Sequence, residues 1–139
     1  MKELLLKKIN NTNWWHVPPR DLDAYKKRGK FLASTYLQAE FYGRPNLIPE
    51  KVLIHNPLFG FSEKEILSKL FGGNIVSRLL KNLTVDNSYK ARIDLDAKMR
   101  DAAVHKGYDA IVLMPPSGRI ALEVGKKPRS IELNLFNVV

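Results

Sequence analysis

The residues best suited to chemistry gather in one stretch, from Asn13 to Gly43. It contains two adjacent tryptophans, His16, a Pro-Pro step, a basic run, the pair Ser34-Thr35 and three tyrosines. Histidine, hydroxyl and aromatic side chains are types that binding sites use to hold and orient ligands. The alternative is a well-packed strand–helix–strand core, because a lone histidine inside an apolar strand is more often structural than catalytic.

Two carboxylates differ from the others, because Glu123 and Glu132 lie inside apolar segments that are predicted as strands. Alternation along residues 131–137 places Glu132 on the face shared with Asn134 and Phe136, a mixed face that could line a cleft. A strand carboxylate can equally point to solvent. The remaining acidic residues considered as candidates are expected to cap helices or to lie on solvated helix faces.

Several site classes are disfavoured by what the sequence lacks. There is no cysteine, which excludes disulfides and thiolate metal sites, and no two of the three histidines have a metal-ligand spacing. The glycine-rich motifs of dinucleotide folds and P-loops are absent, and so is the nucleophile motif GxSxG. These absences disfavour a zinc site, a Rossmann-type site and a serine hydrolase.

The charge balance predicts an affinity for polyanions. Lysine and arginine total 23 against 14 aspartates and glutamates, a formal net charge of +9. Such a field attracts nucleic acid or phosphate-rich ligands, although a lysine-rich soluble surface explains the same composition. The basic runs at residues 26–30 and 126–129 are predicted at a helix end and in a hairpin turn, and would grip phosphates if both lay on one rim.

The chain of 139 residues fits one domain, residues 1–139. The apolar run at its start is too short for a secretory signal, and no window reaches membrane-spanning length. We therefore expect a soluble, cytoplasmic protein without a membrane partner. Its oligomeric state stays open.

The first half of the chain alternates short elements. Residues 3–9 fit either a short strand or a helical turn. Proline and glycine punctuation predicts strands over 14–17, 30–33 and 51–55, and helices over 20–28, 35–42 and 62–70. Ser34 or Thr35 is expected to cap the second helix, and Ser62 with Glu65 forms a capping box for the third.

The second half is predicted to hold most of the sheet. A helix covers 75–83, 84–88 form a loop, 89–93 fit a strand, and a helix capped by Asp94 or Asp96 runs to Lys106. Strands over 108–114, 119–124 and 131–138, separated by two turns, are expected to form an antiparallel meander. The predicted class is α+β, and the role of residues 56–90, lid or core, stays open.

Three separated pieces together resemble the ADP-ribosyltransferase-like domains. Residues 15–22 (WHVPPRDL) resemble their first strand and following helix, and residues 29–35 (GKFLAST), with Ala39 and Tyr42, resemble a strand that ends in Ser/Thr before a helix. Residues 107–112 (GYDAIV) and 132–137 (ELNLFN) are similar to their C-terminal pair of strands. The pieces occur in family order and cover most of the chain outside residues 44–90.

The resemblance implies split antiparallel β-sheets with flanking helices and NAD held between the sheets as a substrate. By residue, His16 would hold the NAD ribose and the Val17 backbone would fix the nicotinamide amide. The pair Ser34-Thr35 would orient the catalytic glutamate, and Tyr36 or Tyr42 would stack on nicotinamide.

Glu132 corresponds to the catalytic glutamate, with Glu123 as its rival. Breaking the nicotinamide–ribose bond develops positive charge on the sugar, which a carboxylate stabilises, and ADP-ribose then passes to an acceptor, nucleic acid or protein. Ser130 stands where arginine-modifying transferases keep an acidic or amide residue, which disfavours arginine as the acceptor. The alternative is a basic nucleic-acid-binding or toxin-like module without NAD chemistry.

Overall fold

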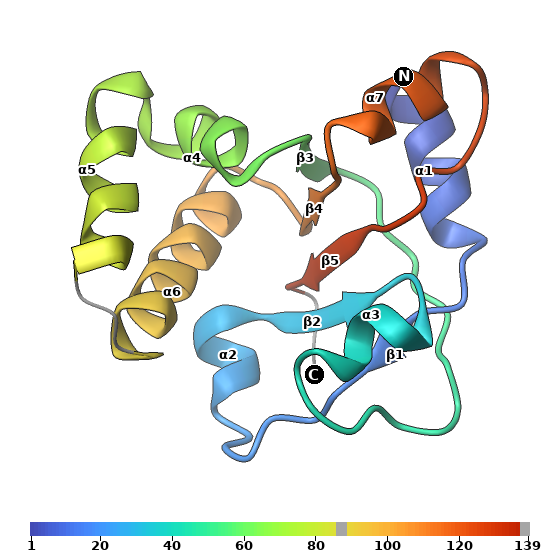
Figure 1. Cartoon of the computed structure of the whole chain (residues 1–139), viewed down its shortest axis with the longest axis horizontal. Helices are drawn as coiled ribbons and strands as arrows, with labels where there is room; N and C mark the ends of the chain where they lie inside the picture. Colours follow the sequence, from blue (N-terminus) through green and yellow to red (C-terminus); the bar gives the residue numbers. More distant parts are fainter. Residues whose placement is uncertain (86–88, 137–139) are drawn as a thin grey trace.

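The centre of the fold is a five-stranded mixed sheet, described here from a computed structural model that covers residues 1–85 and 89–136 (Figure 1). The spatial order is β1-β2-β5-β4-β3, in which β3 and β4 run parallel and all other neighbours run antiparallel. The strands are β1 (Trp15–His16), β2 (Lys30–Ala33), β3 (Pro57–Gly60), β4 (Ala110–Leu113) and β5 (Glu132–Leu135).

Helices cover both faces of this sheet. In Figure 1, α1 and α7 lie together at one end of the molecule and α4, α5 and α6 gather at the other. The helices are α1 (Lys2–Asn10), α2 (Ala24–Arg28), α3 (Tyr36–Glu40), α4 (Glu63–Phe71), α5 (Gly73–Val85), α6 (Tyr89–His105) and α7 (Ser117–Glu123).

Strand register assigns side chains to the two faces. Residues paired across neighbouring strands share a face, and successive residues of one strand alternate between faces. One row of paired residues begins at His16, and we call its face the α1 face; it runs through Leu32, Leu133 and Val112. The next row begins at Trp15, and we call its face the α6 face; it runs through Ala33, Glu132 and Leu113.

Each face buries its own apolar core. On the α1 face, Leu5 and Ile9 of α1 pack with Leu32, Val112 and Leu133, together with Trp14 and Ile54. On the α6 face, Leu58 and Ile111 pack against Ile66, Leu67, Leu95 and Met99 of the helices. Burial of these aliphatic side chains, each contributing roughly 1.5–3 kcal/mol, holds the two helical layers to one sheet.

The predicted strand at 51–55 is wrong, and the strand in this region is β3. Val52 and Ile54 are buried, as a strand pattern requires. However, the backbone N–H and carbonyl of Ile54 are hydrogen-bonded to the side chain of Asn10. The Asn10 amide accepts from the Ile54 N–H at 2.9 Å and donates to the Ile54 carbonyl at 3.1 Å. Because those groups bond to Asn10, they are not available to a neighbouring strand.

Two further predicted strands are helical. Residues 119–124 fall largely in α7, where Gly118 and Leu122, four residues apart, are buried and Ile120 and Val124, also four apart, are exposed. The predicted meander is therefore wrong in its middle strand, although β4 and β5 pair antiparallel as expected. The predicted strand at 89–93 is also wrong, because these residues form the start of α6.

Three other predictions hold only in part. The helix predicted over 20–28 begins at Ala24, residues 84–85 of the predicted loop belong to α5, and the helix predicted to be capped by Asp94 or Asp96 begins at Tyr89. Residues 3–9 are helical in α1, and the predicted strand at 30–33 matches β2. Thr35 is the cap of α3, since its hydroxyl accepts from the Gln38 N–H at 3.1 Å, and the Ser62 hydroxyl caps α4 through the Glu65 N–H at 3.1 Å. Residues 86–88 of a predicted loop and 137–138 of a predicted strand lie outside the described residues.

The mixed composition of helices and strands agrees with the α+β prediction at that level. The described residues form one mixed sheet with a parallel pair, whereas the family resemblance implies two split antiparallel sheets. Within the described part of the chain, every helix is too short or too polar to cross a lipid bilayer.

Candidate functional site

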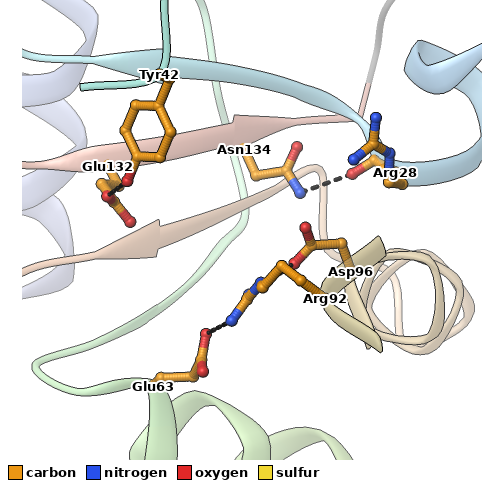
Figure 2. Close-up of polar contacts among 7 residues, drawn as sticks. All are labelled: Arg28, Tyr42, Glu63, Arg92, Asp96, Glu132 and Asn134. Carbon is orange, nitrogen blue, oxygen red and sulfur yellow. Dashed lines mark hydrogen bonds and ion pairs between the residues drawn. The ribbon is translucent and has the colours of Figure 1, made fainter. Parts of the chain in front are cut away.

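The Glu132 carboxylate meets the Tyr42 hydroxyl on the α6 face of the sheet. Figure 2 shows the two side chains directed at each other, and the hydroxyl donates a hydrogen bond to the carboxylate. Glu132 is half-buried at the start of β5, between Ala33 and Leu113 of the neighbouring strands. Tyr42 is 67% exposed, so this pair forms the open end of the site.

The short helix α3 carries Tyr42 to Glu132. Buried Ala39 seats α3 on the sheet, and the ring of Tyr36 meets Trp15 edge-to-face at 5.1 Å between centroids. The Tyr42 N–H donates to the Ala39 carbonyl at 3.0 Å, which continues the helical turn past the end of α3. Partial burial of the hydroxyl, followed by the bond to Glu132, raises the pKa of Tyr42 to about 12. The phenol therefore keeps its proton and donates a hydrogen bond throughout the neutral range.

An ion-pair network borders Glu132 on the helical side. Arg92 of α6 bonds to Asp96, one turn later, at 2.6 Å and to Glu63 of α4 at 2.7 Å (Figure 2). Asp96 is buried, which raises its pKa, and the adjacent guanidinium of Arg92 works in the opposite direction. Burial lowers the pKa of Arg92, but the bonds and charges of Asp96 and Glu63 outweigh it and raise that pKa overall. Arg92 is thus a permanent cation that joins α6 to α4.

A small hollow of about 60 Å³ lies between the sheet, α4 and α6. Its polar lining comes from Glu63, Arg92, Asp96, Glu132 and Asn134. Three carboxylates therefore face one guanidinium, which favours hydrogen-bond donors and positive charge in a ligand. A volume of this size takes one or two water-sized groups. A larger ligand would have to lie across the open end at Tyr42.

Asn134 closes the far end of the hollow and leaves one polar atom without a partner. Its amide nitrogen donates to the Arg28 carbonyl at 2.8 Å (Figure 2), while its Oδ1, although buried, accepts no hydrogen bond from the described residues. A buried acceptor of this kind normally costs about 1–3 kcal/mol when it stays unpaired. Asn134 Oδ1 is therefore a buried acceptor that lies against Gly29, where an added β-carbon would be 2.1 Å away.

His16 lies on the other face of the sheet with both ring nitrogens engaged. Nδ1 is 2.8 Å from the Phe31 carbonyl oxygen and Nε2 is 2.8 Å from the Tyr25 hydroxyl. A carbonyl can only accept, so Nδ1 carries the proton and Nε2 accepts from Tyr25. Burial lowers the pKa of His16, in keeping with a neutral ring. The structure therefore does not bring His16 to Glu132, because the strand register places them on opposite faces.

Ser34 and Thr35 hold the backbone near Glu132, and their side-chain hydrogen bonds in the described part of the chain go to residues other than Glu132. The buried Ser34 hydroxyl accepts from the Ile131 N–H at 3.0 Å and donates to Gln38 at 3.3 Å. The Ser34 N–H bonds in turn to the Ile131 carbonyl at 3.1 Å. Ser34 thus fixes the residue just before Glu132, while Thr35 is used as the cap of α3.

The other predicted site residues have supporting positions. Tyr36 is half-buried against Trp15, so its ring is used in packing. Val17 packs closely on Gly43, where a β-carbon would lie 2.9 Å from the valine side chain, and so it stands beside the segment that carries Tyr42. Glu123, the rival carboxylate, is exposed at the end of α7, away from the residues that line the hollow.

Sequence reasoning missed the network at Arg92, Asp96 and Glu63 and the role of Asn134. The available signal was the spacing of Arg92 and Asp96, which stand four residues apart on one helix face. The prediction of a strand over 89–93 made the helix begin at Asp94 or Asp96, so Arg92 and Asp96 were not expected on one helix. No sequence signal pairs α4 with α6, since that contact is made only in the folded chain.

A second hollow, of about 290 Å³, lies between α5 and α6 and contains none of the predicted site residues. Its walls are mainly aliphatic, with Asp94 and Lys98 at the rim. It is larger than the hollow at Glu132 but carries no convergent set of polar groups. The carboxylate site at Glu132 is therefore the better candidate.

Comparisons with known proteins add no family assignment. No protein-family model matches the chain, and neither the curated proteins nor the solved structures contain a significant match.

Proposed function

We propose that this protein is an ADP-ribosyltransferase-like enzyme that cleaves the nicotinamide–ribose bond of NAD at Glu132. The observation that carries the proposal is the pairing of the half-buried Glu132 carboxylate with the exposed Tyr42 phenol. Both residues belong to segments that resemble the family, ELNLFN for Glu132 and the helix after GKFLAST for Tyr42. The order of these motifs along the chain supports the resemblance, while the single mixed sheet differs from the two split sheets that the resemblance implies.

The chemistry assigned to Glu132 is stabilisation of a cationic sugar. The bond between C1′ of the ribose and the nicotinamide nitrogen breaks, and nicotinamide leaves with the electron pair. The ribose becomes an oxocarbenium ion, which a carboxylate held against its hydroxyl stabilises. The acceptor then bonds to C1′ and releases its proton, so NAD⁺ and the acceptor give nicotinamide, the ADP-ribosyl adduct and one proton.

Tyr42 has two parts in this proposal. Its hydroxyl holds the carboxylate in one orientation, and its exposed ring offers a flat face for the nicotinamide. The acidic surroundings, Glu63 and Asp96, favour the positively charged nicotinamide ring over the pyrophosphate. Because the hollow is only about 60 Å³, the dinucleotide lies across the open end and only small groups enter.

His16 has no direct role in the proposed reaction. Both of its nitrogens are engaged, and it projects onto the α1 face. Its contribution is to hold β1 and α2 together through Tyr25. Ser34 contributes by fixing the start of β5, which is a positioning role rather than a catalytic one.

The test measures the release of nicotinamide from NAD by chromatography. A parallel assay measures the transfer of labelled ADP-ribose to RNA and to protein. Glu132→Gln should lower release by about a hundredfold or more, the usual effect of removing one group that stabilises transition-state charge. Glu123→Gln is the matched control and should leave release unchanged. Release that is absent from the native protein, or that survives Glu132→Gln, would overturn the proposal.

A further inference from the structure

Three lysines from distant parts of the chain lie on segments that share one apolar cluster, which contains Ile9, Val52 and Ile131. They are Lys8 of α1, Lys51 of the segment before β3, and Lys127 of the turn before β5. Lys51 Nζ donates to the Asn11 carbonyl at 2.8 Å, which places it at the helix end that carries Lys8. Partial burial, and then the positive charges of Lys51 and Lys8, lower the pKa of Lys127. We call these three residues the lysine cluster.

Buried neighbours hold each lysine in place despite their mutual repulsion. Ile9 next to Lys8 is fully buried, and Val52 next to Lys51 is buried as well. Pro128, which follows Lys127, is also fully buried and packs on α7, where a β-carbon added to Gly118 would lie 3.3 Å from the proline ring. The three backbones are thus anchored in the apolar core, which keeps the three lysines at neighbouring positions on the surface.

No carboxylate neutralises the lysine cluster in the described part of the chain. The ion pairs found among the described residues use other cations, namely Lys30, Lys69, Arg92, Arg100 and Arg119. Glu50, the acidic neighbour of Lys51 in sequence, pairs with Lys30 instead. Lys51 and Lys127 are exposed, and Lys126 and Arg129 flank the latter on the same exposed turn. The cluster is therefore an uncompensated positive surface.

We propose that Lys8, Lys51 and Lys127 bind the phosphate backbone of a nucleic acid. Clustered ammonium groups contact phosphates as point charges, and the net charge of +9 attracts a polyanion from a distance. The three contributing segments, residues 7–11, 50–53 and 125–129, contain no aromatic residue on which a base could stack. Binding is therefore independent of base sequence and is governed by salt.

The lysine cluster is independent of the Glu132 site. Lys8 belongs to α1, which packs on the α1 face, whereas Glu132 lies on the α6 face. The lysine cluster also differs from the phosphate-binding rim that the sequence suggested, which would combine the basic runs at 26–30 and 126–129. The run at 26–30 lies elsewhere, because the charge of Arg28 acts to lower the pKa of Asp96 and Lys30 pairs with Glu50. Only the run at 126–129 joins the cluster.

The experiment uses fluorescence anisotropy to measure the affinity of the full chain for a short, fluorescently labelled DNA duplex, from about 50 to 200 mM salt. The native protein should show a steep fall of affinity with salt. The triple variant Lys8→Gln, Lys51→Gln, Lys127→Gln should flatten the slope of log K against log salt by about 2.7, which is about 0.9 for each phosphate that a lysine no longer neutralises. Thermal unfolding of the variant shows that the fold is kept.

A second triple variant, Lys26→Gln, Lys27→Gln, Lys64→Gln, removes the same charge from exposed positions outside the cluster and should keep the native slope. An equal loss in both variants would mean that net charge alone binds the duplex, and would overturn the proposal. Exposed Leu53 near Lys51 makes anionic phospholipid the competing ligand. Sedimentation with phosphatidylcholine vesicles, with and without phosphatidylserine, tests this; vesicle binding without duplex binding would also overturn the proposal.

Discussion

His16 and Glu132 project from opposite faces of the same sheet. His16 pairs with Leu32, whereas Glu132 pairs with Ala33, the next residue of β2, and successive strand residues alternate between faces. A slip of one residue in the pairing of β5 would be needed to move Glu132 to the other side, and it would remove the buried Leu133 from the core of the α1 face. The site therefore depends on groups of the α6 face, with Tyr42 as the nearest partner of the carboxylate.

Removing only the Tyr42 hydroxyl should lower the proposed activity while leaving the ring in place. Tyr42→Phe frees the Glu132 carboxylate from its donor, and we expect nicotinamide release to fall about tenfold, since one hydrogen bond to a charged group contributes about 1.5–3 kcal/mol. Tyr42→Ala also removes the ring and should raise KM for NAD. Tyr89→Phe, at another exposed tyrosine, is the control and should change neither parameter. Equal kcat in native protein and Tyr42→Phe would contradict the assigned role.

The buried His16 should make the fold less stable in mild acid. Burial holds its pKa below the ordinary value of 6.5, so its contribution to stability is complete above pH 6.5. As the pH falls below that value, the unfolded chain takes up a proton that the folded chain binds only at lower pH. The free energy of unfolding should therefore decrease by up to about 1.4 kcal/mol per pH unit.

Urea unfolding at about pH 7.5 and about pH 5.5 measures this change. His16→Gln, although less stable overall, should lose most of the pH dependence in that interval, and His55→Gln, at an exposed site, should keep it. The nearby charges of Lys30 and Glu50 act on His16 in opposite directions and are unchanged in both variants. Identical pH profiles for the native protein and His16→Gln would show that another group is responsible.

The sequence predicts best the elements that local chemistry decides. The strand that follows Gly29 at residues 30–33 and the Ser62 hydroxyl as a helix cap follow from local residue types, and the structure confirms both. The second half of the predicted capping box is not seen among the described residues, because the Glu65 carboxylate pairs with Lys69 and Arg119. Alternation fails at 119–124, because a short apolar–polar pattern also satisfies a helix whose buried residues, Gly118 and Leu122, stand four apart. It fails at 51–55 because Asn10, a residue from another element, takes the backbone groups of Ile54.

In the candidate site, too, local features can be predicted from the sequence and contacts between distant elements cannot. Glu132 is accessible to sequence reasoning, because a carboxylate inside an apolar strand is unusual and its segment resembles a known motif. Its pairing with Tyr42 joins residues 90 positions apart, and depends on how α3 lies across the sheet. The separation of His16 from Glu132 depends on the register of a two-residue strand. Neither relationship has a local sequence signal.

Removing the guanidinium of Arg92 should destabilise the fold. Arg92→Gln leaves the carboxylates of Asp96 and Glu63 facing each other without a cation, and Asp96 is buried. Loss of one partner from a buried pair costs about 3–5 kcal/mol, and partial exposure of Arg92 and Glu63 reduces this to about 2 kcal/mol here. Urea unfolding measures the change. Arg78→Gln, on the exposed side of α5, is the control and should alter stability by no more than about 0.5 kcal/mol.

A side chain at Gly29 should disturb Asn134. Gly29 ends α2 at φ +91° and ψ −177°, a region used almost only by glycine, and an added β-carbon would lie 2.1 Å from Asn134 Oδ1. Gly72 is the matched control, because it ends α4 at φ +84° and ψ 155° and an added β-carbon would meet no atom within 4 Å. Gly29→Ala should therefore lower the free energy of unfolding by about 2 kcal/mol more than Gly72→Ala, the excess being the cost of overpacking. Chemical denaturation of both variants measures that difference, and equal losses would mean that Asn134 moves aside freely and does not hold the end of the hollow.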